Sequence, residues 1–154
     1  MKPTKTISLI ILNIFAGRNT MYIEKAEELT CKYNTRNPET IAKEMGINII
    51  RLSYAELIGI AASIGKYRVI GVNSRLEEPL QKFVIAHELG HFILHSEGSF
   101  FFIFKETMLY SKFEYQANLF AIALCFGKKV AQDNDVKSII TGQAKDLYSL
   151  ARIL

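Results

Sequence analysis

Two histidines and the glutamate between them, His87, Glu88 and His91, are the residues of this chain whose spacing most directly suggests chemistry. Histidines four residues apart lie on one face of a helix, about one turn from each other. Their imidazoles can therefore bind a single Zn²⁺ together. The glutamate lies beside the open coordination position, where it can take a proton from a water molecule. The pattern predicts a zinc site with Glu88 as its catalytic base.

A catalytic zinc site commonly has three protein ligands, so one more residue must complete it. His95 is the only other histidine, and it lies one helical turn beyond His91, about 6 Å along the axis. A straight helix cannot easily aim three successive turns at one ion. We therefore expect His95 to pack beside the site or to support a ligand from outside it.

Glu114 is the favoured third ligand, because it lies in a later predicted helix that could cross the histidine helix. Asn118, one turn further on the same face, could then hydrogen-bond a ligand histidine and set its ring orientation. Two alternatives stay open here. Glu106 could be the ligand instead, and Glu114 could be ordinary solvated helix surface.

The donor set of two histidines and one glutamate is that of metallopeptidases of the thermolysin type. Zn²⁺ makes hydroxide accessible at neutral pH, and Glu88 can accept the proton and pass it to the leaving amine. A further donor usually stabilises the developing oxyanion. Tyr67, Tyr110 and Tyr115 are candidates, and the sequence does not choose among them. The strand expected at 67–72 could dock an extended peptide if it lies exposed at the cleft.

The helix that carries the histidines is expected at 79–95. Pro79 suits its first turn, and acidic residues precede it. Apolar residues occupy much of its circumference, which predicts a buried helix. Burying His87, Glu88 and His91 is costly unless something pairs with them, and a metal ion provides that pairing.

The remaining elements follow from periodicity and turn residues. Helices are expected at 21–33 and at 112–126, and Gly127 would end the second of these. A short helix is expected to begin at Pro38, with Asn37 as its N-terminal cap. Strands are expected at 47–52 and 67–72, whereas 54–60 is ambiguous. The aromatic run 99–104 predicts a buried strand or loop, or else a hydrophobic wall of a substrate cleft. One or two further helices are expected at 135–154, with a break at Gly142.

Composition places the chain among ordinary globular domains. It has 154 residues, of which 49% are hydrophobic and 22% charged, enough for a single domain with its own core. The net charge of +4 is modest and scattered, which argues against nucleic-acid binding. Cys31 and Cys125 form no C-x-x-C pair, so we expect reduced thiols packed as small apolar residues, and no part in a zinc site.

The first twenty residues are interpreted separately from the domain expected at 21–154. Lys2 and Lys5 precede an apolar run at 7–15 that is too short to span a bilayer as a helix. We favour an extension upstream of a natural start at Met21. A weak signal peptide and a buried or partner-pairing strand are the alternatives. No other stretch is apolar enough for a membrane span.

Two segments together resemble a known family. The first is H-E-L-G-H-F-I-L-H at 87–95, and the second is E-Y-Q-A-N-L-F-A at 114–121. They are similar to the motif blocks of the ImmA/IrrE metallopeptidases, and the upstream segments 34–38 and 42–47 fit as well. The resemblance covers roughly residues 21–126. Both blocks together are specific, whereas H-E-x-x-H alone would not separate this family from other zincins.

The resemblance implies an α+β fold, namely a zincin-like metallopeptidase domain that is mainly helical with a small β-sheet. It also implies a cytoplasmic, zinc-dependent endopeptidase with one Zn²⁺, gluzincin-like in its ligands. Its protein partner would be a helix-turn-helix repressor whose cleavage releases genes of a mobile element or a stress response. Motif matching makes His87, His91 and Glu114 the ligands and Glu88 the catalytic residue.

Two departures from the family pattern stand out. Gln116 occupies a position where a glutamate is common, and Leu124-Cys125-Phe126-Gly127 replaces an apolar run that ends in Met-Pro. The alternative to an enzyme is a non-catalytic binding module that sequesters a regulator or toxin partner. Glu88 argues against this alternative, because a pure binder needs no base. A structural metal site in a transcription factor is disfavoured, because no paired cysteines would close the coordination sphere.

Overall fold

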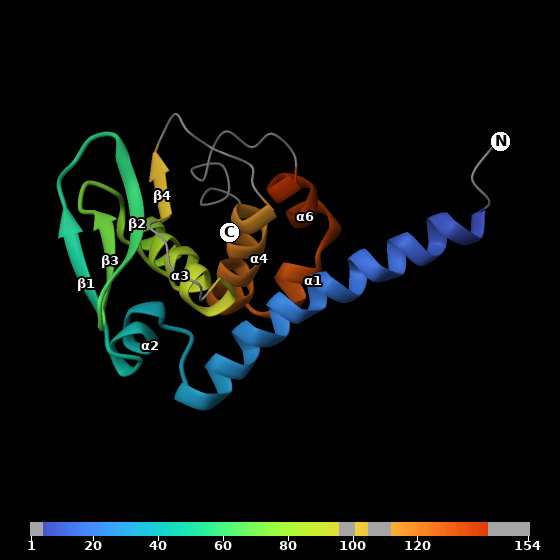
Figure 1. Cartoon of the computed structure of the whole chain (residues 1–154), viewed down its shortest axis with the longest axis horizontal. Helices are drawn as coiled ribbons and strands as arrows, with labels where there is room; N and C mark the ends of the chain where they lie inside the picture. The colour runs from blue at the N-terminus through green and yellow to red at the C-terminus, as the bar shows by residue number, and fades with distance from the viewer. Residues whose placement is uncertain (1–4, 96–100, 105–111, 142–154) are drawn as a thin grey trace.

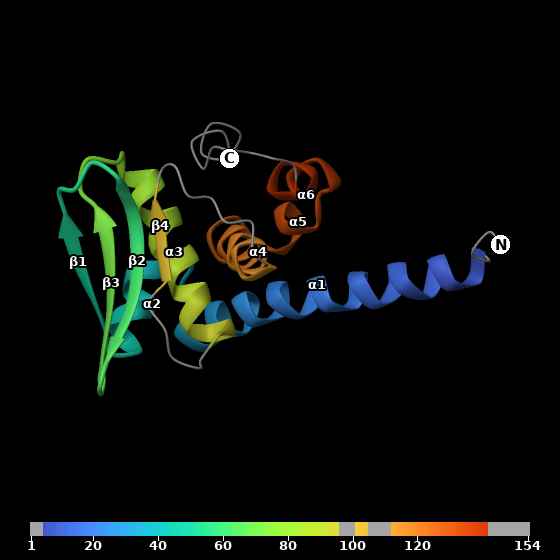
Figure 2. The same cartoon turned by 45° about the horizontal axis from the view of Figure 1, so that its top comes forward.

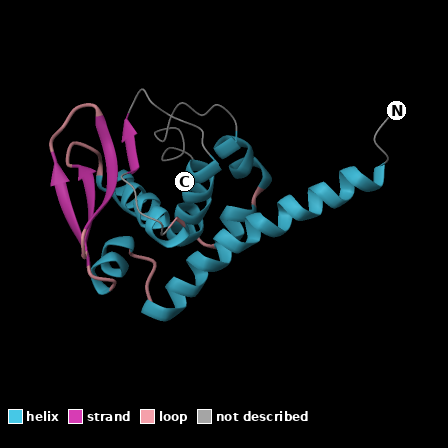
Figure 3. Cartoon of the chain, viewed as in Figure 1, coloured by secondary structure: helices cyan, strands magenta, loops and turns pink. Residues whose placement is uncertain are grey.

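A four-stranded sheet and the helices packed on one of its faces organise the fold (Figures 1 and 3). The computed structural model describes residues 5–95, 101–104 and 112–141. Helix α3 (Glu78–Leu94) lies against the sheet, and α4 (Lys112–Phe126) lies on the other side of α3 (Figure 2). This layered arrangement confirms the expected α+β class with a small sheet.

The N-terminal helices connect α4 to the sheet. Helix α1 (Lys5–Tyr33) packs along α4, and its N-terminal half extends beyond the other elements (Figures 1 and 2). It ends at the predicted residue, but it begins sixteen residues before the predicted start at Met21, so the strand alternative for residues 7–15 is wrong. Among the described residues, no helix has both the length and the apolarity needed to cross a membrane.

Helix α2 (Pro38–Glu44) begins as its sequence predicts. The side chain of Asn37 accepts hydrogen bonds from the backbone N–H groups of Glu39 and Thr40, at 3.0 and 3.4 Å. Such a cap satisfies donors that the first turn of a helix leaves unpaired. Gly46, with φ of +70°, follows the helix and turns the chain into the first strand.

The sheet has the order β1-β3-β2-β4. Strand β1 (Ile47–Leu52) runs parallel to β3 (Tyr67–Asn73), and β2 (Leu57–Ile64) runs antiparallel to β3 and to β4 (Phe101–Phe104). The condition for peptide docking at the strand 67–72, an exposed edge, is not met, because β3 is hydrogen-bonded to a strand on both sides. The described edges of the sheet are β1 and β4.

The core lies between the sheet and the paired helices α3 and α4. Every residue of α3 from Phe83 to His91 is buried, as its apolar circumference predicts. Close approach of the two helices depends on Gly90, where an added Cβ would lie 3.0 Å from a ring carbon of Phe120 and 3.4 Å from the Cα of Ala117. The glycine inside H-E-L-G-H therefore lets α4 lie directly on the histidine helix.

Several elements differ from expectation. The ambiguous stretch 54–60 contains the start of β2, and a short helix, α5 (Lys128–Gln132), was not predicted. Helix α6 (Asn134–Thr141) accounts for the described part of the expected C-terminal helices. The predicted break at Gly142 lies outside the described residues. Strand β4 occupies the second part of the aromatic run, and residues 96–100 lie outside the described part.

Candidate metal centre

His87 and His91 project from one face of α3 in its most deeply buried stretch. Both side chains are at most 1% exposed. Their Nε2 atoms lie 3.1 Å apart, and the two rings meet edge to face with centroids separated by 4.8 Å. The four-residue spacing on a straight helix brings the two imidazole nitrogens together in this way.

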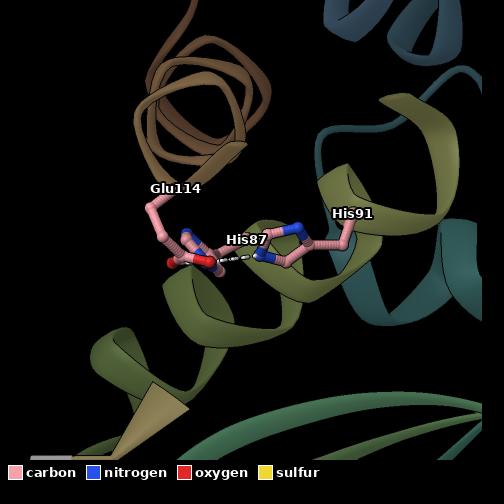
Figure 4. A group of neighbouring side chains, drawn as sticks. All are labelled: His87, His91 and Glu114. Carbon is pink, nitrogen blue, oxygen red and sulfur yellow. Dashed lines mark hydrogen bonds and ion pairs between the residues drawn. The ribbon is translucent and has the colours of Figure 1, made fainter. Parts of the chain in front are cut away.

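Glu114 reaches the same point from the first turn of α4 (Figure 4). One carboxylate oxygen lies 3.1 Å from Nε2 of His87, and the other lies 3.2 Å from Nε2 of His91. One ligand atom from each of the three residues can be chosen so that all lie within 4.8 Å of one another. The structure thus brings together the three residues that the sequence proposed as ligands.

Asn118 holds the outer side of the His87 ring. Its side-chain oxygen lies 2.8 Å from Nδ1 of His87. An amide oxygen only accepts hydrogen bonds, so Nδ1 must carry the hydrogen. This leaves Nε2 as the ring nitrogen that can offer a lone pair to a metal ion, and Nε2 is also the atom that lies beside the Glu114 carboxylate. Two imidazole nitrogens and a carboxylate oxygen gathered at one point are a donor set that fits a metal ion.

The electrostatics of the cluster support the same conclusion. Burial lowers the pKa of His91 to about 4 although Glu114 favours the charged ring, so the imidazole is neutral at pH 7. Burial opposes ionisation of Glu114, but hydrogen bonds with His87 and His91 outweigh it and lower its pKa to about 2. A carboxylate and neutral imidazoles are the protonation states that zinc requires of these ligands.

Glu88 follows His87 on α3 and is fully buried. Neither of its carboxylate oxygens has a hydrogen-bond partner among the described residues. Burial, and secondarily the negative charge of Glu114, raise the pKa of Glu88 well above its ordinary value. A buried carboxyl that lacks a partner is costly for a structural residue. Such a group beside a candidate metal site is typical of a catalytic base.

The other candidates from the sequence lie elsewhere or are not described. His95 follows the last residue of α3, and its ring packs against Phe113 and His91, with centroids 4.4 and 5.6 Å away. This agrees with packing beside the site and not with a place among the three clustered donors. The alternative ligand Glu106 lies outside the described residues.

The tyrosines proposed as oxyanion donors are not brought to the cluster by any described contact. Tyr67 is 60% exposed at the turn between β2 and β3. Tyr115 hydrogen-bonds Asn19 of α1, and Tyr110 lies outside the described residues. An oxyanion-stabilising residue therefore stays unassigned.

Two features of the site region were not anticipated from the sequence. Gly59 of β2 lies directly against Glu88. Gln116, which stands where the family pattern commonly has a glutamate, donates a 2.7 Å hydrogen bond to the hydroxyl of Tyr22 on α1. Neither feature has a local sequence signal, because each depends on which strand or helix lies opposite.

The clustered donors suit a metal-dependent peptidase, and comparison with known proteins agrees. The peptidase M78 family, described as the IrrE N-terminal-like domain, matches residues 42–134, and the chain belongs to this family. The match contains all three clustered donors and Glu88. The resemblance found in the two motif blocks is thereby confirmed.

Two relatives illustrate the likeness. Uncharacterized immunity region protein 2 of Bacillus phage phi105 is 35% identical over 111 residues, which cover 70% of each chain. Metallopeptidase ImmA of Bacillus subtilis strain 168 is 38% identical over 79 residues, which are 51% of this chain and 44% of the relative. The match therefore spans less than half of ImmA. No solved structure matches the chain significantly.

Proposed function

We propose that this chain is a zinc-dependent endopeptidase that cleaves a helix-turn-helix repressor. His87, His91 and Glu114 are its metal ligands and Glu88 is its catalytic residue. The observation that carries the proposal is the convergence of three potential ligands from two helices beside a buried carboxyl that has no hydrogen-bond partner among the described residues. Zinc is the proposed ion, because two histidines and one carboxylate are a donor set of catalytic zinc sites.

The residues around the ion have separate tasks. When bound, Zn²⁺ supplies Lewis acidity, which polarises a carbonyl and acidifies a water molecule. The Glu88 carboxylate takes the proton of the attacking water and later delivers it to the leaving amine nitrogen. Asn118 fixes the His87 tautomer so that Nε2 faces the ion. The apolar walls of α3 and β2 exclude bulk water from Glu88, which strengthens these interactions.

The repressor substrate is supported by the family and by the names of the relatives. One relative is named for a phage immunity region and another is named a metallopeptidase. A repressor that maintains immunity is a protein whose hydrolysis would relieve repression of a mobile element or of a stress response. Such a substrate places the enzyme in the cytoplasm, with a protein partner and without direct contact to nucleic acid or membrane.

A non-catalytic module that sequesters a regulator or toxin partner is the competing function. It would share the fold and could share the metal ion. It gives Glu88 no task, however, and leaves its buried carboxyl as an unexplained cost. The two functions therefore differ in what they predict for a substitution of Glu88.

The test is cleavage of the helix-turn-helix regulator encoded nearest to this chain's gene. Zinc-loaded wild type should cut the purified regulator into two fragments, as seen by mass spectrometry. Glu88→Gln should bind one zinc ion per chain but lose activity by a factor of about 100 to 10,000, the usual contribution of a general base. Glu78→Gln, an exposed acid on the same helix, is the matched control and should cut like wild type.

Two outcomes would overturn the proposal. Undiminished cleavage by Glu88→Gln would remove Glu88 from the chemistry. If neither protein cuts the regulator while both bind it and relieve repression, the sequestering module is the correct function.

A further inference from the structure

Gly59 of β2 lies against the side chain of Glu88 so closely that no other amino acid would leave that side chain in place. A Cβ added at residue 59 would lie 2.7 Å from Oε1 of Glu88 and 3.3 Å from its Cγ. It would also lie 2.5 Å from a methyl group of Val84, one turn earlier on α3. Real Cβ atoms essentially never approach heavy atoms this closely, so something must move.

The requirement for glycine at this position is one of space and not of backbone conformation. Positive φ angles among the described glycines occur at Gly46, Gly65 and Gly127, and Gly59 is not one of them. Any residue could adopt its backbone. Glycine in a strand interior is unfavourable, and it often marks a place where another group approaches closely. Here the approaching group is the proposed catalytic carboxyl.

The strand is also irregular at this point. The pairing of β2 with β4 changes register between Leu57, which faces Phe104, and Gly59, which faces Ile103. Such bulges change the direction of neighbouring residues and occur often beside active sites. The irregularity and the missing side chain thus coincide at the residue in contact with Glu88.

Packing alone can position the Glu88 carboxylate. Neither oxygen has a hydrogen-bond partner among the described residues, so no polar contact there holds the side chain. Its place is set by the walls around it, and Gly59 forms one of them. The far end of a glutamate is the most easily displaced of the groups that an added Cβ would meet.

We propose that Gly59 is a positioning residue for Glu88, an inference that rests on the proposed peptidase function. The absence of a side chain at residue 59 gives the carboxylate the space it needs to take a proton from the attacking water. A methyl group there would push the carboxylate aside while the three metal ligands remain in place.

Gly71 of β3 offers a matched control. A Cβ at residue 71 would lie 2.6 Å from a methyl group of Ile60 and 3.0 Å from one of Leu52. The shortest of these contacts is comparable with the 2.5 Å contact at Gly59, and the φ angle of Gly71 is likewise not among the positive ones. It involves only apolar side chains, however, and not Glu88. Gly71→Ala therefore reports the cost of crowding the sheet without disturbing the site.

The first experiment measures stability and needs no substrate. Melting temperatures are compared for wild type, Gly59→Ala, Glu88→Ala and the double variant, with the equivalent set for Gly71→Ala. Removing the Glu88 side chain should restore part of the melting temperature lost in Gly59→Ala and none of that lost in Gly71→Ala. If Gly59→Ala lowers the melting temperature equally in wild type and in the Glu88→Ala background, the inference is overturned.

The second experiment measures kcat and KM for cleavage of the regulator, together with zinc content. Gly59→Ala should lower kcat at least tenfold, with KM and one zinc ion per chain retained, whereas Gly71→Ala should keep kcat near wild type. If Glu88→Gln is inactive but Gly59→Ala retains wild-type kcat, the role of Gly59 is wrong and the proposed function stands. If Glu88→Gln is fully active, the proposed function itself fails.

Discussion

Asn118 illustrates how a residue outside the cluster controls a proposed ligand. Its oxygen accepts from Nδ1 of His87, and this leaves Nε2 to bind the ion. We predict that Asn118→Ala binds zinc about 10 to 100 times more weakly, the usual effect of losing such a partner. Competition against a chromogenic chelator measures the affinity. Asn48→Ala, at an exposed position on β1, should not change it.

The result that would contradict this prediction is an unchanged zinc affinity in Asn118→Ala. The His87 ring would then be oriented by packing alone, and Asn118 would not determine which ring nitrogen of His87 carries the hydrogen.

The two cysteines should differ sharply in reactivity. Both are free, as expected from their spacing, but Cys31 is exposed, so the prediction that it packs as a small apolar residue is wrong. Burial raises the pKa of Cys125 to about 12, so almost none of it is thiolate at neutral pH. Because the thiolate is the nucleophile, Cys125 should react with a maleimide at least about tenfold more slowly than Cys31. Time-resolved mass spectrometry of Cys31→Ser and Cys125→Ser measures both rates, and equal rates would contradict the burial of Cys125.

At the residue scale, the sequence predicts the relative positions of site residues that lie close together on one helix. His87, Glu88 and His91 share one helix, so their relation follows from helix geometry. Glu114 could be proposed only as a residue of a neighbouring helix, because its approach depends on how α4 crosses α3. Gly59 could not be proposed at all, because only the folded sheet places it against Glu88.

At the scale of elements, a buried pair of polar groups connects α1 to α4. Gln116 donates to the hydroxyl of Tyr22, and both residues are buried. Tyr22→Phe would leave the Gln116 amide without this acceptor, and we predict a loss of about 1 to 3 kcal/mol in the free energy of unfolding. Denaturant titration measures it. Tyr54→Phe, at a position 59% exposed, should change stability little.

If Tyr22→Phe is as stable as wild type, the hydrogen bond contributes nothing to the attachment of α1. The prediction requires that adding Gln116→Leu to Tyr22→Phe raises the free energy of unfolding again. If the hydrogen bond contributes nothing, the double variant shows no such increase.

The elements that sequence reasoning predicted well are those with strong end signals. The Asn37 cap and Pro38 mark the start of α2, and Gly127, with φ of +93°, follows the end of α4. The start of β2 lies in the ambiguous stretch 54–60, where Ala55, Glu56 and Gly59 have low strand propensity. Its pairing with β3 and β4 outweighs that local preference, and such pairing is not visible in a single stretch of sequence.

At the scale of the whole molecule, a bound ion would connect α3 to α4 and so stabilise the fold. A ligand at a thousand times its dissociation constant stabilises the native state by about 4 kcal/mol. For a domain of this size we predict that EDTA lowers the melting temperature by roughly 10 °C, and that added zinc restores it. Differential scanning calorimetry measures the shift, and His91→Ala should not respond to zinc. Identical melting curves with and without metal would contradict a bound ion.

The fold class of the whole molecule was predictable, but the order of the strands in the sheet was not. The two motif blocks indicate the family, and the resemblance to that family implies the α+β class that the structure has. Which strand lies in the middle of the sheet was not predicted, because strand order depends on contacts between distant segments. For this reason the sequence left open whether the strand at 67–72 is exposed for peptide docking, and the structure shows that β3 is interior.

The central claim is that His87, His91 and Glu114 hold one zinc ion between α3 and α4. Anomalous diffraction at the zinc edge, from crystals of the purified protein, tests it most directly. The account predicts one strong peak per chain about 2.0 to 2.2 Å from Nε2 of each histidine and from a Glu114 oxygen. A peak bound by other residues, or zinc-soaked crystals with no peak between these three side chains, would contradict it.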